Sequence, residues 1–240
     1  MKNYVSSTLL SVAIVLLFSA CGNQKGKSSE AETAVEPVAV NVVQPAVIFE
    51  NDYAKVISVT LAPGDSLASH QGDTRVIYSL SDYSIEWTEG NVNKGIKSWK
   101  SGDVHFHEQG IHSAKNNGSS TAKWLAFIKK DTELPDCSDN TLEKDINAAA
   151  PNFAKQLLDN ERFRITEVTI PEGGEIPTHS GINRIVYSRS DYQIMYKSDQ
   201  EGSGEKQFKK GDLHWHESCR HSLENIGEKE AVFIVVAFKK

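Results

Sequence analysis

The residues of this sequence best suited to chemistry are its eight histidines, which fall into two groups of four. The first group is His70, His105, His107 and His112, and the second is His179, His214, His216 and His221. Corresponding members lie 109 positions apart, and the sequence has no other histidine. Clustered neutral imidazoles suit transition metals, and a metal site needs three or four ligands. The pattern therefore predicts one divalent transition metal per group, with Fe, Mn, Zn, Ni and Cu all open.

The spacing within a group predicts which histidines could share an ion. His105 and His107 lie two positions apart on an expected strand, so their side chains should project from one face. His112 follows a turn and is expected on the next strand of a hairpin, where the length of the turn decides its face. The predicted ligands are His70, His107 and His112, with His105 as a fourth ligand or a neighbour, and the corresponding four residues in the second group.

Two charged residues repeat together with the histidines. Arg75 matches Arg184, and Glu108 matches Glu217. The arginine offers a planar fork for a substrate carboxylate, and the glutamate would orient a histidine or act as an acid or base. The alternative is a hydrogen-bonded cluster of these residues with the histidines that is structural or sensitive to pH. Both interpretations stay open.

The positions of these residues follow from a tandem duplication. Residues 51–130 align with residues 160–239 without a gap, and 27 of the 80 pairs are identical. Within each copy, short runs rich in Val, Ile, Tyr and Trp are bounded by Gly, Pro, Asn and Asp, which is typical of antiparallel strands and tight turns. Several short strands in about 80 residues predict a small all-β sandwich or barrel in each copy.

The connection between the copies differs in composition. Residues 141–151 and 152–160 carry Ala, Leu, Glu and Lys at helical spacing, with Pro151 between the two runs. We expect one or two short helices here. The expected boundaries are a first domain at 46–130, a helical linker at 131–158 and a second domain at 159–240.

The N-terminus predicts export. Met1-Lys2-Asn3 precedes an apolar run at residues 4–18, and Ser19-Ala20-Cys21 follows. This order resembles the lipobox of bacterial lipoproteins, in which the cysteine is lipidated. An uncleaved anchor is the alternative, but the run is shorter than the ~20 residues of a spanning helix. We expect a signal peptide at 1–20, lipidation of Cys21 and a disordered tether at 21–45, with the protein held on the bacterial cell envelope, at the outer membrane or the periplasmic face.

Charge and cysteine content narrow the partners. The net charge is −6, with acids and bases interspersed, so nothing points to nucleic acid, and the expected membrane contact is through the lipid alone. The expected partner inside each domain is a small molecule. If Cys21 carries lipid, Cys137 and Cys219 remain, and whether they pair stays open.

The spacing of glycines, histidines and asparagines resembles the cupin superfamily. In the first copy five residues separate Gly64 from His70, and Gly102-Asp103 leads to His112 and Asn116; the second copy has Gly173, His179, Gly211-Asp212, His221 and Asn225. Cupins have a glycine, five residues and H-x-H, then a Glu, and later P-x-G with a His and an Asn. The resemblance covers about two-thirds of the chain and implies two tandem jelly-roll β-barrels, with dioxygenase or isomerase chemistry on a small organic acid or sugar if the protein is an enzyme.

Several positions depart from the cupin pattern. Gly72 and Gly181 stand at the second-histidine position, Arg75 and Arg184 fall at or beside the Glu, and Glu108 and Glu217 replace the Pro. Two hypotheses follow. The first is an exported, lipid-anchored bicupin that binds a metal and a small molecule in each barrel. The second is a degenerate, non-enzymatic cupin that serves as a ligand-binding or structural protein of the envelope.

Overall fold

The computed structural model describes residues 41–137 and 140–240, so the expected signal peptide, Cys21 and most of the expected tether lie outside the described residues. The described chain is nearly all β-strand, as predicted. In the first half the strands are β1 (Ala46–Glu50), β2 (Ala54–Leu61), β3 (Ser66–Gly72), β4 (Arg75–Ser79), β5 (Tyr83–Glu89), β6 (Val92–Trp99), β7 (Val104–His107), β8 (Gly110–Asn116) and β9 (Ala122–Lys129). In the second half they are β10 (Ala154–Asp159), β11 (Phe163–Ile170), β12 (Glu175–Gly181), β13 (Arg184–Ser188), β14 (Tyr192–Ser198), β15 (Gly202–Phe208), β16 (Leu213–His216), β17 (Cys219–Asn225) and β18 (Ala231–Phe238).

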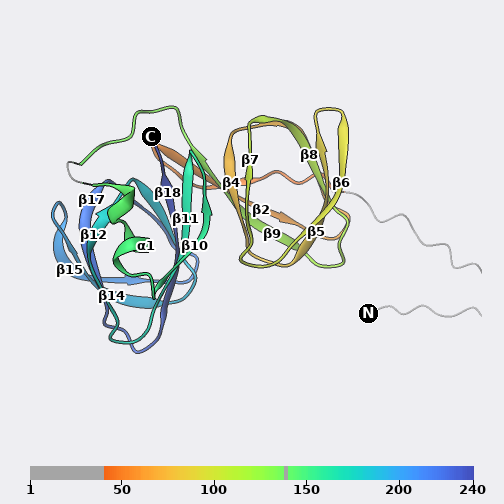
Figure 1. Ribbon diagram of the computed structural model, residues 1–240. Helices are drawn as coiled ribbons and strands as arrows, with labels where there is room; N and C mark the ends of the chain where they lie inside the picture. The colour runs from red at the N-terminus through yellow and green to blue at the C-terminus, as the bar shows by residue number, and fades with distance from the viewer. Residues whose placement is uncertain (1–40, 138–139) are drawn as a thin grey trace, which may run out of the picture. The chain divides into compact units, whose positions relative to one another are not determined.

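The two halves have the same topology. The first contains a five-stranded sheet in the order β1-β2-β9-β4-β7 and a four-stranded sheet in the order β3-β8-β5-β6 (Figure 1). The second repeats both sheets as β10-β11-β18-β13-β16 and β12-β17-β14-β15. The prediction that the gapless repeats fold alike is confirmed.

Each half is a β-sandwich closed around an apolar core. In the first half Val59, Ile77 and Trp124 from the five-stranded sheet pack against Tyr83 and Ile85 from the four-stranded sheet. The outer faces of the two five-stranded sheets form another apolar cluster with each other. Strands β4 and β13 are therefore buried on both faces, which explains why all five residues of each are buried.

Of the two linker runs expected to form one or two short helices, the second is not helical, because Ala154–Asp159 is strand β10 and pairs with β11. Ala154, Leu157 and Leu158 have the i, i+3, i+4 spacing of a helix. In the structure that spacing arises from a β-bulge between Gln156 and Leu158, which leaves both leucines partly buried against the core. Strand β1 has its bulge at the corresponding place, between Val47 and Phe49. The duplicated unit therefore starts one strand earlier than the aligned segment, and the second half begins at residue 154 rather than 159.

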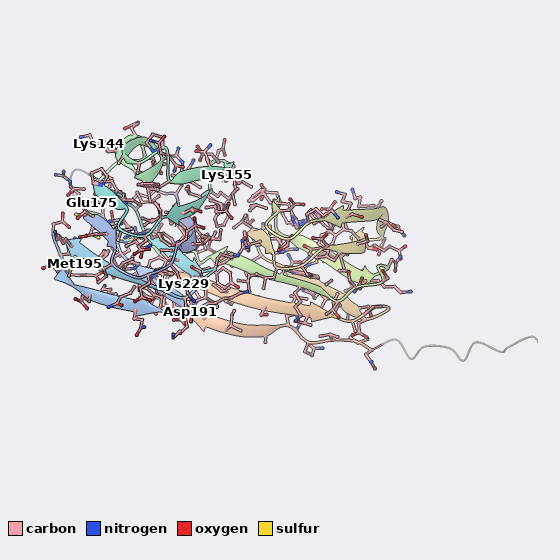
Figure 2. All side chains as sticks on the ribbon, turned by 90° about the horizontal axis from the view of Figure 1, so that it is seen from below. Lys144, Lys155, Glu175, Asp191, Met195 and Lys229 are labelled. Atoms are coloured by element: carbon pink, nitrogen blue, oxygen red, sulfur yellow. The ribbon has the colours of Figure 1, made fainter. Side chains whose placement is uncertain are left out.

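The connecting segment contains a 3₁₀ turn, η1 (Leu142–Lys144), and one short helix, α1 (Ile146–Ala149). Asp145 caps α1 by accepting a hydrogen bond from the Asn147 amide, and the helix ends before Pro151, as expected. Both elements contact β12 of the second half, and Figure 2 labels Lys144 of η1 and Glu175 of β12 on this part of the surface. The connecting segment therefore packs against the second half.

The end of the expected tether is also ordered against a sheet. The Val43 amide donates to the Ser66 carbonyl at 2.9 Å, and the Ser66 amide donates to the Asn41 carbonyl at 3.0 Å. Residues 41–45 therefore belong to the first half rather than to a free tether. Cys137 and Cys219 are unpaired thiols in this structure. Among the described residues no helix has the length and apolar character needed to cross a membrane.

Candidate functional site

The four histidines of each half line one cavity between its two sheets. His105 and His107 reach it from β7, and His70 and His112 reach it from β3 and β8, where they are opposite each other in register. The corresponding four residues line the cavity of the second half. The prediction that His105 and His107 share a face is thus confirmed.

The predicted hairpin between β7 and β8 is wrong. Strand β7 pairs with β4, whereas β8 pairs with β3 and β5 in the other sheet. The chain crosses from one sheet to the other between His107 and Gly110, so His112 faces His107 across the sandwich rather than along a hairpin. Side chains of both strands reach the cavity because its walls belong to different sheets.

An arginine lies beside each histidine group and contacts one of its members. Arg75 Nη1 donates to the Asp73 carbonyl at 2.8 Å, and Arg75 Nη2 lies 2.9 Å from Nε2 of His112. In the second half, Arg184 contacts Nε2 of His221 at 3.3 Å and donates to two backbone carbonyls. Both arginines are buried, with 6% and 4% of their surface exposed. No carboxylate among residues 41–137 and 140–240 lies within ion-pair distance of either guanidinium.

Three imidazoles near Arg75 and the four near Arg184 are neutral at pH 7. Burial lowers the pKa of His105 and of His112 to about 4 and that of His107 to about 3, and the Arg75 charge lowers all three further. In the second half burial likewise lowers the pKa of His179 and of His214 to about 4. Burial, followed by the Arg184 charge, lowers the pKa values of His216 and His221 as well. Arg75 and Arg184 therefore lie next to uncharged rings. The cavity walls also include Lys55 and Asp73 in the first half, and Asp145, Arg164 and Lys206 in the second.

Hydrogen bonds fix the tautomers of two histidines in each site. Nδ1 of His70 lies 2.8 Å from the Ala68 carbonyl, and Nδ1 of His112 lies 3.1 Å from the Gly110 carbonyl. A carbonyl only accepts, so Nδ1 carries the proton in both rings and Nε2 is an acceptor. For His112 that acceptor receives the hydrogen bond from Arg75.

Aromatic side chains pack against the histidines of each site. The Trp87 ring lies 4.6 Å from the His107 ring and 4.7 Å from the His112 ring, and Trp99 stacks on His105 at 4.4 Å. Tyr196 and Phe208 take the same places in the second half. Sequence reasoning missed these four residues, although both pairs are aromatic at the 109-residue offset, a signal that could have found them.

One polar atom in each site lacks a partner. Nδ1 of His105 and Nδ1 of the corresponding His214 are buried, and neither forms a hydrogen bond within the part of the chain that is described. Buried polar atoms are normally satisfied, and an exception at the same atom of both copies indicates a place for a ligand or a water molecule.

Two predicted site residues do not reach the cavities. Glu108 and Glu217 are exposed and line neither cavity. The Glu108 carboxylate accepts a hydrogen bond from the Thr74 hydroxyl, and only the backbone carbonyl of Glu217 contacts Arg184. Because both residues follow strands that end at the rim, their side chains point to solvent. The predicted role in orienting a histidine has no supporting contact.

The side chains do not fit a metal ion as they lie. The described residues contain no group of three or more His, Cys, Asp or Glu side chains placed to hold one. At Gly72, the cupin second-histidine position, an added Cβ would overlap Cε1 of His112 and lie 2.7 Å from Nη1 of Arg75. An added Cβ at Gly181 would likewise overlap Arg184 and lie 2.5 Å from Cε1 of His221. The guanidinium and His112, or His221 in the second half, thus leave no room for a metal-binding side chain at either glycine.

Several solved structures resemble this chain over most of its length. AerE from Microcystis aeruginosa is 19% identical over 82% of this chain and 97% of its own, with a TM-score of 0.56. A variant of oxalate decarboxylase from Bacillus subtilis is 13% identical over 83% of this chain and 74% of its own, with a TM-score of 0.59. The chain has the cupin fold. The predicted fold class, two tandem cupin barrels joined by a short helical segment, is confirmed.

Sequence comparison adds no closer relationship. No protein-family model matches the sequence, and no curated protein matches it either. Oxalate decarboxylase from Lactobacillus farciminis, solved as a formate complex, is 13% identical over 78% of this chain with a TM-score of 0.55. Another study concerns the Mn(II) centres of the Bacillus subtilis enzyme. At these identities the cupin likeness shows the fold alone.

Proposed function

We propose that each barrel binds a small organic carboxylate through its buried arginine, without a metal ion, and that the protein is a ligand-binding cupin rather than an enzyme. The observation that carries this proposal is the environment of Arg75. Its guanidinium is buried, lines the cavity among neutral imidazoles and has no carboxylate partner in the described part of the chain. Arg184 repeats this environment in the second barrel.

A buried, unpaired cation calls for an anionic ligand. Removing a charge from water costs several kcal/mol unless a partner compensates for it. The bonds of Arg75 to Asp73 and His112 leave further N–H donors of the guanidinium free. A carboxylate accepts two parallel hydrogen bonds from such a fork. It would therefore supply the missing countercharge, and its oxygen could also accept from the unpartnered Nδ1 of His105.

The same arginine opposes a metal ion. An ion bound to Nε2 of His112 would compete with Arg75 for the lone pair that the guanidinium already contacts. A divalent ion about 4 Å from the guanidinium would be repelled by roughly 8 kcal/mol at an effective dielectric constant of about 20. The described residues place no group of three or more His, Cys, Asp or Glu side chains around such an ion to offset that repulsion.

A metal-dependent enzyme, with the dioxygenase or isomerase chemistry of other cupins, is the second candidate. Its support is the orientation of His70 and His112, whose Nδ1–H groups both donate to backbone carbonyls. Metal-binding histidines are commonly oriented in this way, with Nε2 facing the ion. This candidate requires Arg75 to leave His112 when the metal binds.

We also propose that the barrels are held on the bacterial envelope by a lipid on Cys21. The support is the order of the N-terminal sequence, in which a basic start, an apolar run and Ser-Ala-Cys follow one another. The membrane is then a partner through the lipid, and the barrels are exposed to solutes at the outer membrane or the periplasmic face.

Calorimetric titration of acetate into the purified full-length chain tests the carboxylate proposal. We expect Arg75→Gln and Arg184→Gln each to remove one binding site, with an affinity loss at that site of about tenfold to a hundredfold. The double variant should bind no acetate. Arg220→Gln, an exposed arginine outside both cavities, is the matched control and should bind as the native chain does. Absence of binding by the native chain, or undiminished binding by the double variant, would overturn the proposal.

A further inference from the structure

The two cavities differ in volume, and two positions in their apolar walls carry larger side chains in the smaller cavity. The first cavity has a volume of about 150 Å³ and the second about 50 Å³. Ala114 and Ala126 line the first, whereas Leu223 and Val235 occupy the corresponding positions in the second. The larger side chains add carbon atoms inside the second barrel. Both polar ends, in contrast, contain four histidines and one arginine at corresponding positions.

The added space in the first barrel is apolar and partly aromatic. Val59, Ile85, Trp99 and Trp124 line it together with the two alanines. An apolar protein cavity of about 150 Å³ is large enough to hold a benzene molecule, and such cavities stay dry when empty. The first cavity therefore has room for one six-membered ring next to the carboxylate site, and the second does not.

The first cavity is also more accessible to solvent than the second. His70 at the mouth of the first barrel is exposed, whereas the corresponding His179 is 4% exposed. Asp145 and Ile146, at the start of α1, line the second cavity and cover this side of the barrel. In the second barrel Glu201 also lies 3.3 Å from Nδ1 of His216, whereas the first barrel has Val92 at that position. The second site is thus both smaller and more enclosed.

We infer that the first barrel binds a carboxylate attached to an aromatic ring, with the ring among Trp99, Trp124 and Ala126 and the carboxylate on Arg75, whereas the second barrel admits only a carboxylate of a few atoms. This inference rests on the proposed function and specifies the ligand class of its first site. The ring lies in the apolar end of the cavity, and the charged group lies between the guanidinium and the neutral imidazoles. Trp87 flanks that polar end, where its ring packs against His107 and His112.

Calorimetric titration of benzoate and, separately, of acetate into the full-length chain tests the inference. The expected result is one benzoate per chain, but acetate bound in both barrels. Arg75→Gln should abolish benzoate binding, since the carboxylate contact lies in the first barrel.

Ala126→Val and Ala114→Leu give the first cavity the residues of the second and should weaken benzoate binding at least tenfold. If the leucine overpacks the core, the smaller valine change still provides the test. Ala46→Val, which adds the same atoms on the exposed strand β1, is the control and should leave benzoate binding unchanged.

The outcomes separate this inference from the proposed function. Binding of acetate without benzoate overturns the inference and leaves the carboxylate sites standing. Two benzoate molecules per chain, or benzoate binding that Ala126→Val does not weaken, also overturn the inference alone. Binding of neither acid overturns both.

Discussion

Nη2 of Arg75 lies 2.9 Å from Nε2 of His112, and the same contact joins Arg184 to His221 at 3.3 Å in the second barrel. In each barrel the guanidinium uses the lone pair of the histidine that the cupin pattern assigns to a metal. The preceding glycine leaves room for this contact, since a side chain at Gly72 or Gly181 would overlap it. Arginine, histidine and glycine therefore form one unit, which the duplication has kept in both copies.

The need for glycine beside this contact can be measured directly. Gly72→Ala places a methyl group against His112 and Arg75, so we expect the free energy of unfolding to fall by about 1–3 kcal/mol, together with acetate affinity in the first barrel. Gly204→Ala is the matched control, because an added Cβ there meets no atom within 4 Å. Urea denaturation of both variants provides the comparison. Equal stability of the two would show that the contact between Arg75 and His112 adjusts without cost.

Stability should fall below neutral pH because of the buried histidines. Their pKa values in the folded protein, about 3 for His107 and about 4 for His105 and His112, are lower than the value of about 6.5 in an unfolded chain. Between these values the unfolded chain binds protons that the folded chain does not. The free energy of unfolding is therefore highest above pH 6.5 and decreases as the pH falls toward 4.

Each such histidine should contribute a loss of about 1 kcal/mol per pH unit within that window. Urea denaturation at pH 7.5, 6.5 and 5.5 measures the slope before most carboxylates titrate. His105→Gln, which removes one titrating group, should have a shallower slope than the native chain. A free energy of unfolding that stays constant from pH 7.5 to 5.5 would contradict the neutral assignment of the imidazoles.

Asn116 should matter for folding rather than for binding. Its side-chain amide donates to the Leu61 and Ser120 carbonyls and its oxygen accepts from the Gly118 amide, while the residue is 1% exposed and does not line the cavity. Asn116→Ala leaves these groups without partners, so we expect a loss of about 2–4 kcal/mol. The exposed neighbour Asn117 provides the control, since Asn117→Ala should cost less than about 1 kcal/mol. Thermal denaturation measures both, and similar losses would contradict this role.

The sequence alone was sufficient for the repeat and the all-β class. The constant offset put every histidine and both arginines at equivalent places in the two halves, because a duplicated fold brings equivalent positions to equivalent places. The crossing from β7 to β8 could not be read, since a short turn and a change of sheet have the same sequence signals. The bulge in β10 could not be read either, because it gives Ala154, Leu157 and Leu158 the spacing that is typical of a helix.

Two further features depend on packing across the sandwich. Glu108 was predicted to act in the site, but its position at the end of β7 turns it to solvent. Ala114 and Ala126 of the larger cavity come from opposite sheets and line the same space only in the folded barrel. Neither the strand pattern nor the histidine spacing contains that information.

The envelope proposal is tested by changing the residue expected to carry the lipid. Cys21→Ser should release the protein from the membrane fraction or leave an unprocessed precursor, because the acyl chains are the expected anchor. Fractionation of cells that express the native and the variant chain, followed by mass measurement of the N-terminus, gives the answer. Unchanged processing and membrane association would contradict lipidation at this cysteine.

Metal content tests most directly whether an arginine takes the place of a metal in each barrel. An untagged full-length chain would be incubated with Mn(II), Fe(II), Zn(II), Ni(II) or Cu(II), desalted, and measured by inductively coupled plasma mass spectrometry, alongside His107→Ala. The account predicts far less than one ion per barrel for every metal, with no difference between the native and the variant chain. Two ions per native chain, reduced to one by His107→Ala, would contradict it and identify the histidines as metal ligands.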